Sequence, residues 1–186
     1  GVTIMRVVKA LDAAAMLATA RRPIGPDDTS DEVEHDLARL GGALLVDVVD
    51  RLANGPIEEV AQDDSGATYA HRLTKEDGLI DWTCPAPAIH NLVRGMRPWP
   101  NAYSYIGGKR LILLTSSAVE DEPSISGQPA APGQVIAAKA DDLRIATGRG
   151  TLVVREVQAE GKRPMAVRDF LAGHRLSPGD QFTATP

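Results

Sequence analysis

The chain has 186 residues, of which 43% are hydrophobic and 24% are charged. This length accommodates one ordinary domain or two small ones, and the composition supports a buried core and excludes wholesale disorder. Only 4% of the residues are aromatic, so valine, leucine, isoleucine and alanine must form most of the core. No run of about 18 apolar residues occurs, which excludes a membrane-spanning helix.

The net charge of −5 is unevenly distributed along the chain. Residues 1–70 carry 6 basic and 13 acidic side chains, whereas residues 71–186 carry 14 basic and 12 acidic ones. This asymmetry favours two units with different partners, and an acidic surface helix beside a single domain is the alternative. The single cysteine, Cys84, cannot form an internal disulfide, and no signal peptide is present, so we expect a cytoplasmic protein. The chain opens at Gly1 directly in an apolar run, as expected for a cut through a domain.

Two strands, at 1–8 and 18–24, and a long helix are predicted in the acidic half. The helix begins at T-S-D-E (29–32), a capping box in which the threonine and glutamate side chains satisfy each other's backbone amides. It ends at Asn54-Gly55-Pro56, because glycine takes the left-handed cap and proline cannot continue a helix. A helix of about 24 residues with a one-sided apolar stripe should lie on a sheet. The stripe consists of Val33, Leu37, Leu40, Leu44, Val48 and Leu52, widened by Leu45 and Val49.

After a connector at 55–75, the second half predicts a short helix, five strands and a closing helix. The short helix lies within 85–100 and stops at Pro98, because proline lacks an amide and restrains the residue before it. Gly107-Gly108 is a two-residue hairpin signal. Five short antiparallel strands with peripheral helices indicate a small open barrel of the OB type. The expected strands are 102–106, 109–115, 134–139, 143–147 and 151–158, and the last helix is 165–175.

One carboxylate in the first half is a candidate for chemistry. Asp12 follows the first predicted strand, and ligands of open α/β sheets bind beyond the carboxyl ends of strands. A carboxylate in that place can relay a proton or orient a histidine, and a turn aspartate bonded to its own backbone is the alternative. The histidines and the cysteine show no metal-ligand spacing, so no metal site is expected.

Basic residues in the second half are candidates for phosphate contacts. His90, Arg94 and Arg97 share one helix face, for which a solvated surface is the alternative. Arginine and lysine on a barrel surface engage phosphates without reading bases, and Trp99, with two tyrosines, can stack on bases unless it packs as a plug. The expected contacts are Arg94, Arg97, Lys109, Arg110, Arg149, Lys162 and Arg163.

Three segments form a specific pattern, in order along the chain: "QDDSGATYAHRLTKEDGLIDW", "PAPAIHNLVRGMRPWPNAYSYIGGKRL" and "VQAEGKRPM". Together with the flanking sequence they resemble the methionyl-tRNA formyltransferase family over essentially the whole chain. The resemblance implies transfer of a formyl group from 10-formyltetrahydrofolate to the amine of methionyl-initiator tRNA in translation initiation. It implies that residues 1–70 are an α/β remnant of a Rossmann-like formyltransferase domain with its linker. Residues 71–186 would then be a mainly β, OB-like open barrel with peripheral helices that binds tRNA.

The resemblance also assigns roles to individual residues. Family members use an asparagine and a histidine to stabilise the oxyanion and an aspartate to assist proton movement, and Asp12 matches that aspartate. The seven basic residues become tRNA contacts. Two departures stand out: the front of the catalytic domain, with its folate-binding "HGSLLP"-like loop, is absent, and Ala13-Ala14-Ala15 replaces T-G-D. We therefore expect this chain alone to be inactive, its partners being the missing N-terminal part and the tRNA, in a monomeric enzyme.

Two other functions stay open from the sequence. One is a non-catalytic nucleic-acid-binding module of OB type, and the other is a formyltransferase acting on another amine, such as a sugar nucleotide. An Asn-x-His followed by S-L-L-P upstream of this segment would distinguish a formyltransferase from the binding module.

Overall fold

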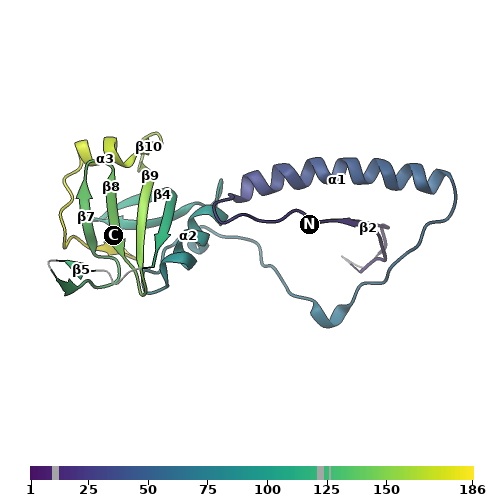
Figure 1. The fold of residues 1–186 in the computed structure, drawn as a ribbon, viewed down its shortest axis with the longest axis horizontal. Helices are drawn as coiled ribbons and strands as arrows, with labels where there is room; N and C mark the ends of the chain where they lie inside the picture. Colours follow the sequence, from purple (N-terminus) through teal and green to yellow (C-terminus); the bar gives the residue numbers. More distant parts are fainter. Residues whose placement is uncertain (10–12, 121–123, 126) are drawn as a thin grey trace. The chain divides into compact units, whose positions relative to one another are not determined.

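The structure is a computed structural model that describes residues 1–9, 13–120, 124–125 and 127–186. The chain divides into two compact units, Gly1–Arg72 and Leu73–Pro186 (Figure 1). Among the described residues, no helix is long and apolar enough to cross a membrane.

The first unit is an antiparallel strand pair covered by one long helix. Strands β1 (Val2–Met5) and β2 (Met16–Ala20) pair with each other, and α1 (Ser30–Ala53) packs on both (Figure 1). A Cβ at Gly41 would lie 3.1 Å from Cγ2 of Val2, so the absence of a side chain there allows the helix to approach the strand. Strand β2 lies earlier than the predicted 18–24, because the Arg22 side chain turns toward α1 and Pro23 has no amide for a ladder.

Helix α1 confirms the predicted long helix and its capping box at Thr29 and Glu32. Val48 is only 1% exposed, and the rest of the predicted stripe is partly covered. Leu45 and Val49, predicted to widen the stripe, are instead 49% and 54% exposed, because the two short strands are too narrow to cover them.

The connector after α1 has little regular structure. It contains one 3₁₀ turn, η1 (Asp64–Gly66), and a second, η2 (Glu76–Gly78), opens the other unit. The backbones of Val60 and Met16 exchange two hydrogen bonds of 2.7 and 2.9 Å, which fix the start of the connector against the edge of β2.

The second unit is a curled antiparallel sheet with two helices. All five predicted strands are present, as β3 (Ala102–Ile106), β4 (Lys109–Val119), β7 (Val135–Lys139), β8 (Asp142–Ala146) and β9 (Thr151–Ala159). The short strands β5 (Ser124–Ile125), β6 (Gln128–Pro129), β10 (Met165–Ala166) and β11 (Phe182–Thr183) were not predicted. Helices α2 (Ala86–Gly95) and α3 (Val167–Gly173) lie within the predicted segments.

Strand order and closure give this unit an OB-like character. The order is β11-β3-β4-β9-β8-β7, with β10 beside β9, and β4, β9, β8 and β7 stand side by side in Figure 1. Backbone bonds then join the two ends of the sheet: Val135 N–H donates to Asp180 O (2.8 Å) and Phe182 N–H donates to Gly133 O (2.9 Å). The mainly β, OB-like prediction for the second half is confirmed at this level.

The β3–β4 hairpin forms as the two glycines predict. Gly107 and Gly108 take φ values of 55° and 73°, which glycine adopts without steric cost, and Ile106 pairs with Lys109. This turn places Lys109 and Arg110 at one end of the barrel.

The core lies inside the curled sheet and beneath α2. It is built from aliphatic residues of alternating positions on the strands, joined by Ile89 and Val93 of α2. Trp82 Nε1 donates to Ser104 Oγ (2.9 Å), so the buried indole N–H is satisfied. The large aliphatic strand residues of this core are Leu111, Leu113, Val135, Leu143, Ile145, Leu152, Val154 and Val157.

We expect Gly148→Ala to destabilise the second unit by about 1–3 kcal/mol, because the new methyl cannot fit without moving backbone. A Cβ at this position would overlap Thr83 O, and the Gly148 amide already bonds Trp82 O and Cys84 O. Gly95→Ala is the control, because nothing lies within 4 Å of its Cβ position and alanine favours the end of α2. Thermal unfolding of the two variants measures the difference, and equal midpoints would contradict the close approach.

Candidate functional site

The predicted catalytic residue, Asp12, lies outside the described residues, so its role stays a prediction. The nearest described residue with defined contacts is Ala14, which is 4% exposed and accepts a 2.8 Å hydrogen bond from Gln62 Nε2. Ala14 therefore lies in the packing of the first unit.

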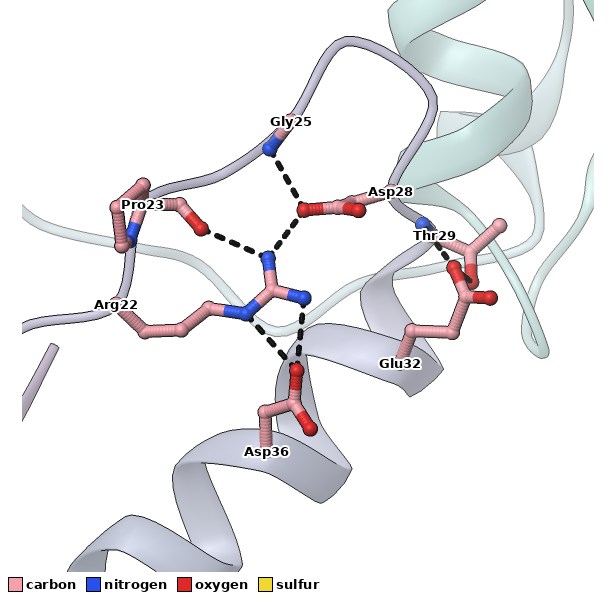
Figure 2. A network of polar contacts seen from close by, with 7 residues as sticks. All are labelled: Arg22, Pro23, Gly25, Asp28, Thr29, Glu32 and Asp36. Atoms are coloured by element: carbon pink, nitrogen blue, oxygen red, sulfur yellow. Dashed lines mark hydrogen bonds and ion pairs between the residues drawn. The ribbon is translucent and has the colours of Figure 1, made fainter.

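The densest charged cluster of the first unit surrounds Arg22 (Figure 2). Its Nε and Nη2 donate to Asp36 Oδ2 at 3.0 and 2.8 Å, while Nη1 donates to Asp28 and to Pro23 O. Hydrogen bonds to Asp28, and then to Asp36, raise the pKa of the Arg22 guanidinium. Asp28 also accepts from Gly25 N–H at 2.6 Å. These contacts fasten the loop before α1 to the helix (Figure 2).

At the start of α1, the Glu32 carboxylate accepts two hydrogen bonds from Thr29. The backbone N–H and the hydroxyl of Thr29 donate to Oε2 at 2.9 and 2.7 Å (Figure 2). These bonds, the backbone one first, hold the pKa of the Glu32 carboxyl below its ordinary value. The carboxylate thus supports the helix N-terminus in its ionised form.

The strongest candidate site is a groove of about 750 Å³ at the hairpin end of the barrel. Its walls come from the β3–β4 hairpin, the end of β9, the chain after α3, and the residues before β11. These segments are far apart in sequence, and the closure of the sheet brings them together. The charged residues lining it are Lys109, Arg110, Lys162 and Arg175, together with Glu160 and Asp180.

The Arg110 guanidinium lies on the face of the β3–β4 pair that carries Tyr103 and Tyr105, and neither tyrosine lines the groove. Its guanidinium carbon lies 4.0 Å from the centroid of the Tyr103 ring, whose edge-on neighbour is Tyr105 at 6.0 Å and 85°. Arg110 Nε is buried and has no hydrogen-bond partner among the described residues. Tyr103 is 9% exposed, so it supports the arginine from below and does not offer a free face for a base.

A stacked pair of rings lines the groove. The His174 ring lies over Phe170, with centroids 4.3 Å apart and planes 16° apart. His174 Nδ1 is 3.1 Å from Phe170 O, and since a carbonyl oxygen only accepts, Nδ1 carries the proton. Sequence analysis did not select His174 or Arg175, because nothing in a local pattern relates the end of the last helix to a hairpin more than sixty residues away.

The structure divides the seven predicted contacts into separate groups. Lys109, Arg110 and Lys162 line the groove, whereas Arg163, the neighbour of Lys162, does not. The backbone carbonyl of Arg149 accepts from Ala86 N–H (2.9 Å), which places Arg149 at the N-terminal end of α2.

Arg94 and Arg97 lie at the opposite end of α2. Arg97 Nη1 is 3.3 Å from Leu114 O on β4, and Arg94 Nε donates to Asn91 Oδ1 (2.7 Å). Trp99 follows them and is 51% exposed, so it is not a buried packing plug. Leu114, which Arg97 contacts, lies four residues after Arg110 on β4. At about 3.3 Å per residue, the two positions are roughly 13 Å apart along the strand.

Residues 72–175 match the model of the formyl transferase C-terminal domain. The chain belongs to this family. It is similar to the methionyl-tRNA formyltransferase of Citrifermentans bemidjiense, with 42% identity over 179 residues, 96% of this chain and 54% of that protein. It is similar to the enzyme of the same name from Solibacter usitatus, with 42% identity over 182 residues, 98% of this chain and 56% of that protein. The resemblance to methionyl-tRNA formyltransferases is confirmed, and the chain spans about half the length of these relatives.

Solved structures share the fold of this family member at low identity. HypX from Aquifex aeolicus superimposes with a TM-score of 0.67 and 16% identity, covering 95% of this chain and 31% of that one. WlaRD, a sugar 3N-formyl transferase, superimposes with a TM-score of 0.63 and 15% identity, covering 87% and 55%. At such identity these similarities show a common fold and carry no assignment of substrate.

We expect the stabilisation of the α1 N-terminus by the ionised Glu32 carboxylate to be lost at acidic pH. Its folded-state pKa lies below the unfolded value, so its contribution is complete above the ordinary glutamate pKa and disappears as pH falls through the folded pKa. The amide proton shift of Thr29, followed by NMR, should titrate with this carboxyl. In Glu32→Gln that titration should be absent, and an unchanged titration would show that the amide senses another group.

Proposed function

We propose that this chain is the C-terminal part of a methionyl-tRNA formyltransferase, which transfers the formyl group of 10-formyltetrahydrofolate to the amine of methionyl-initiator tRNA. The observation that carries the proposal is the 42% identity to an enzyme of that name over 96% of the chain. This similarity runs through both units. The basic groove on the barrel supports it, because an anionic RNA needs such a surface and the chain as a whole is acidic.

The two units then have different tasks. Residues 1–70 belong to the Rossmann-like catalytic domain, and residues 71–186 bind the tRNA. A neighbour in fold, HypX, has been solved in complex with tetrahydrofolic acid, which favours a folate donor. The apolar groove beside Gly1, Val2 and Leu37 carries one carboxylate, Glu34, and no lysine or arginine side chain among the described residues for the glutamate tail of a folate. We therefore assign donor binding to parts of the complete enzyme outside this chain.

Asp12 is proposed to be the family's catalytic aspartate. The methionyl amine must lose a proton as it attacks the formyl carbonyl, and a carboxylate that assists this transfer typically contributes about 10²–10⁴-fold in rate. The same carboxylate can orient the histidine that stabilises the oxyanion. The alternative functions are binding of nucleic acid without catalysis and formyl transfer to another amine.

We expect Asp12→Asn in the complete enzyme to lower kcat for formylation of methionyl-tRNA at least 100-fold while leaving tRNA affinity unchanged. The matched control is Asp50→Asn, which makes the same change on the exposed face of α1. Retained turnover in Asp12→Asn would contradict the catalytic role. Binding of tRNA by the complete wild-type protein without any formylation would favour the non-catalytic module.

We expect Lys109→Ala combined with Lys162→Ala to weaken tRNA binding and to reduce its dependence on salt. Loss of two phosphate contacts should lower the slope of log K against log salt by about 2. Lys75→Ala combined with Lys139→Ala removes the same charge from exposed positions outside the groove and should leave the slope close to wild type. Filter binding or fluorescence anisotropy across a salt series measures both, and equal slopes in the two double variants would remove the groove from the interface.

A further inference from the structure

One short stretch of the connector lies against the place where the chain re-enters the strand pair after Asp12. Residues 6–15 connect β1 to β2, and β2 begins at Met16. The backbone of Met16 exchanges two hydrogen bonds with that of Val60, of 2.7 and 2.9 Å. Connector residues 59–62 therefore pair with the start of β2, immediately beyond the segment that carries the proposed catalytic aspartate.

Gln62 holds the backbone between Asp12 and the start of β2. Its Nε2 donates a 2.8 Å hydrogen bond to the carbonyl of Ala14. Because Ala14 is 4% exposed, its carbonyl has little access to water and needs a donor from the protein. The Gln62 side chain is exposed, so water would solvate it without this contact. The bond therefore serves the buried segment more than it serves the connector.

A contact at the other end of the segment contributes less. Arg6 Nε donates to Glu59 Oε1 at 2.6 Å, but the two side chains are 52% and 38% exposed. Exposed ion pairs add little to stability, because water solvates the separate charges and salt screens them. The placement of the chain around Ala14 thus depends more on Val60 and Gln62. Val60 acts through its backbone, so Gln62 is the contact that a substitution can test.

We propose that Gln62 is a positioning residue, which sets the place of Asp12 for proton transfer by holding the backbone at Ala14. A carboxylate that assists proton transfer must lie within hydrogen-bond reach of the reacting amine. A misplacement of about 1 Å can cost about 100-fold in rate. Gln62 is assigned no contact with the substrate. The inference rests on the role proposed for Asp12, and it makes the connector a part of the structure that supports catalysis.

The test measures single-turnover formylation of methionyl-tRNA by the complete enzyme. Gln62→Met keeps the length of the side chain and removes the donor, so it should lower the maximal rate about tenfold or more. The tRNA concentration that gives half the maximal rate should stay within about twofold of wild type, because uniform binding is not affected. Gln62→Lys, which keeps an N–H donor, should restore the maximal rate to within about threefold of wild type.

Asn54→Leu is the matched control in the same unit. Asn54 Nδ2 also donates a 2.8 Å hydrogen bond to a backbone carbonyl, that of Asp50 near the end of α1. Loss of this bond should leave the maximal rate within about twofold of wild type, because residues more than about 7–10 Å from a site with no shared partners act independently of it. A loss of rate in Asn54→Leu equal to that in Gln62→Met would show a general effect of weakening the unit and would overturn the inference.

A double-mutant cycle with Asp12→Asn shows whether Gln62 acts through Asp12. In the Asp12→Asn background, Gln62→Met should change the residual rate by less than about twofold, because the group that it positions is already lost. Equal losses in both backgrounds, or wild-type turnover by Gln62→Met, would contradict the positioning role. If Gln62→Met does not fold, Gln62→Asn, one methylene shorter, replaces it with the same expected loss. Wild-type turnover by Asp12→Asn alone would instead refute the role proposed for Asp12, so the two failures are distinguishable.

Discussion

The backbone hydrogen bonds between residues 133–135 and 179–182 are the constraint on which the second unit depends. Val135 both donates to Asp180 O and accepts from Gly179 N–H, and Phe182 donates to Gly133 O. These bonds join the two ends of the sheet, so no long edge is left open to pair with another chain. They also carry Phe182 into the core, where its ring lies 5.4 Å from that of Trp82. The hydrophobic core and the closure therefore stabilise each other.

The same closure creates the groove. Without it, the residues after α3 would have no reason to lie beside the β3–β4 hairpin, and Arg175 would be distant from Lys109 and Arg110. The cations are placed at strand ends and turns, where their side chains reach solvent while the strands remain apolar inside. The chain has a net charge of −5, so this positive charge at one end of the barrel is local.

The first unit shows how a short sheet can hold a long helix in register. Two strands cover only part of α1, and polar contacts also fix the position of its first turns. Arg22 bonds both Asp28 and Asp36, and Glu32 accepts a hydrogen bond from Thr29 N–H at the start of the helix. Leu45, Val46 and Val49 stay exposed on the helix. The chain spans about half the length of the relatives it matches.

The sequence by itself determined the elements whose signals are local. The T-S-D-E box and the three- and four-residue apolar spacing defined α1, and Gly107-Gly108 defined the hairpin, because caps and turns depend on a few adjacent residues. The family was also readable, since "IDW", "RPWPNAY" and "VQAEGKRPM", each loose alone, are specific together. The tertiary structure alone decided the two-residue strands β10 and β11, which have no periodicity to detect. It alone decided which cations line the groove: Lys109, Lys162 and Arg175 do, and Arg94, Arg149 and Arg163 do not. The sequence around a basic residue does not show which distant residues lie beside it, because the closed sheet sets those distances.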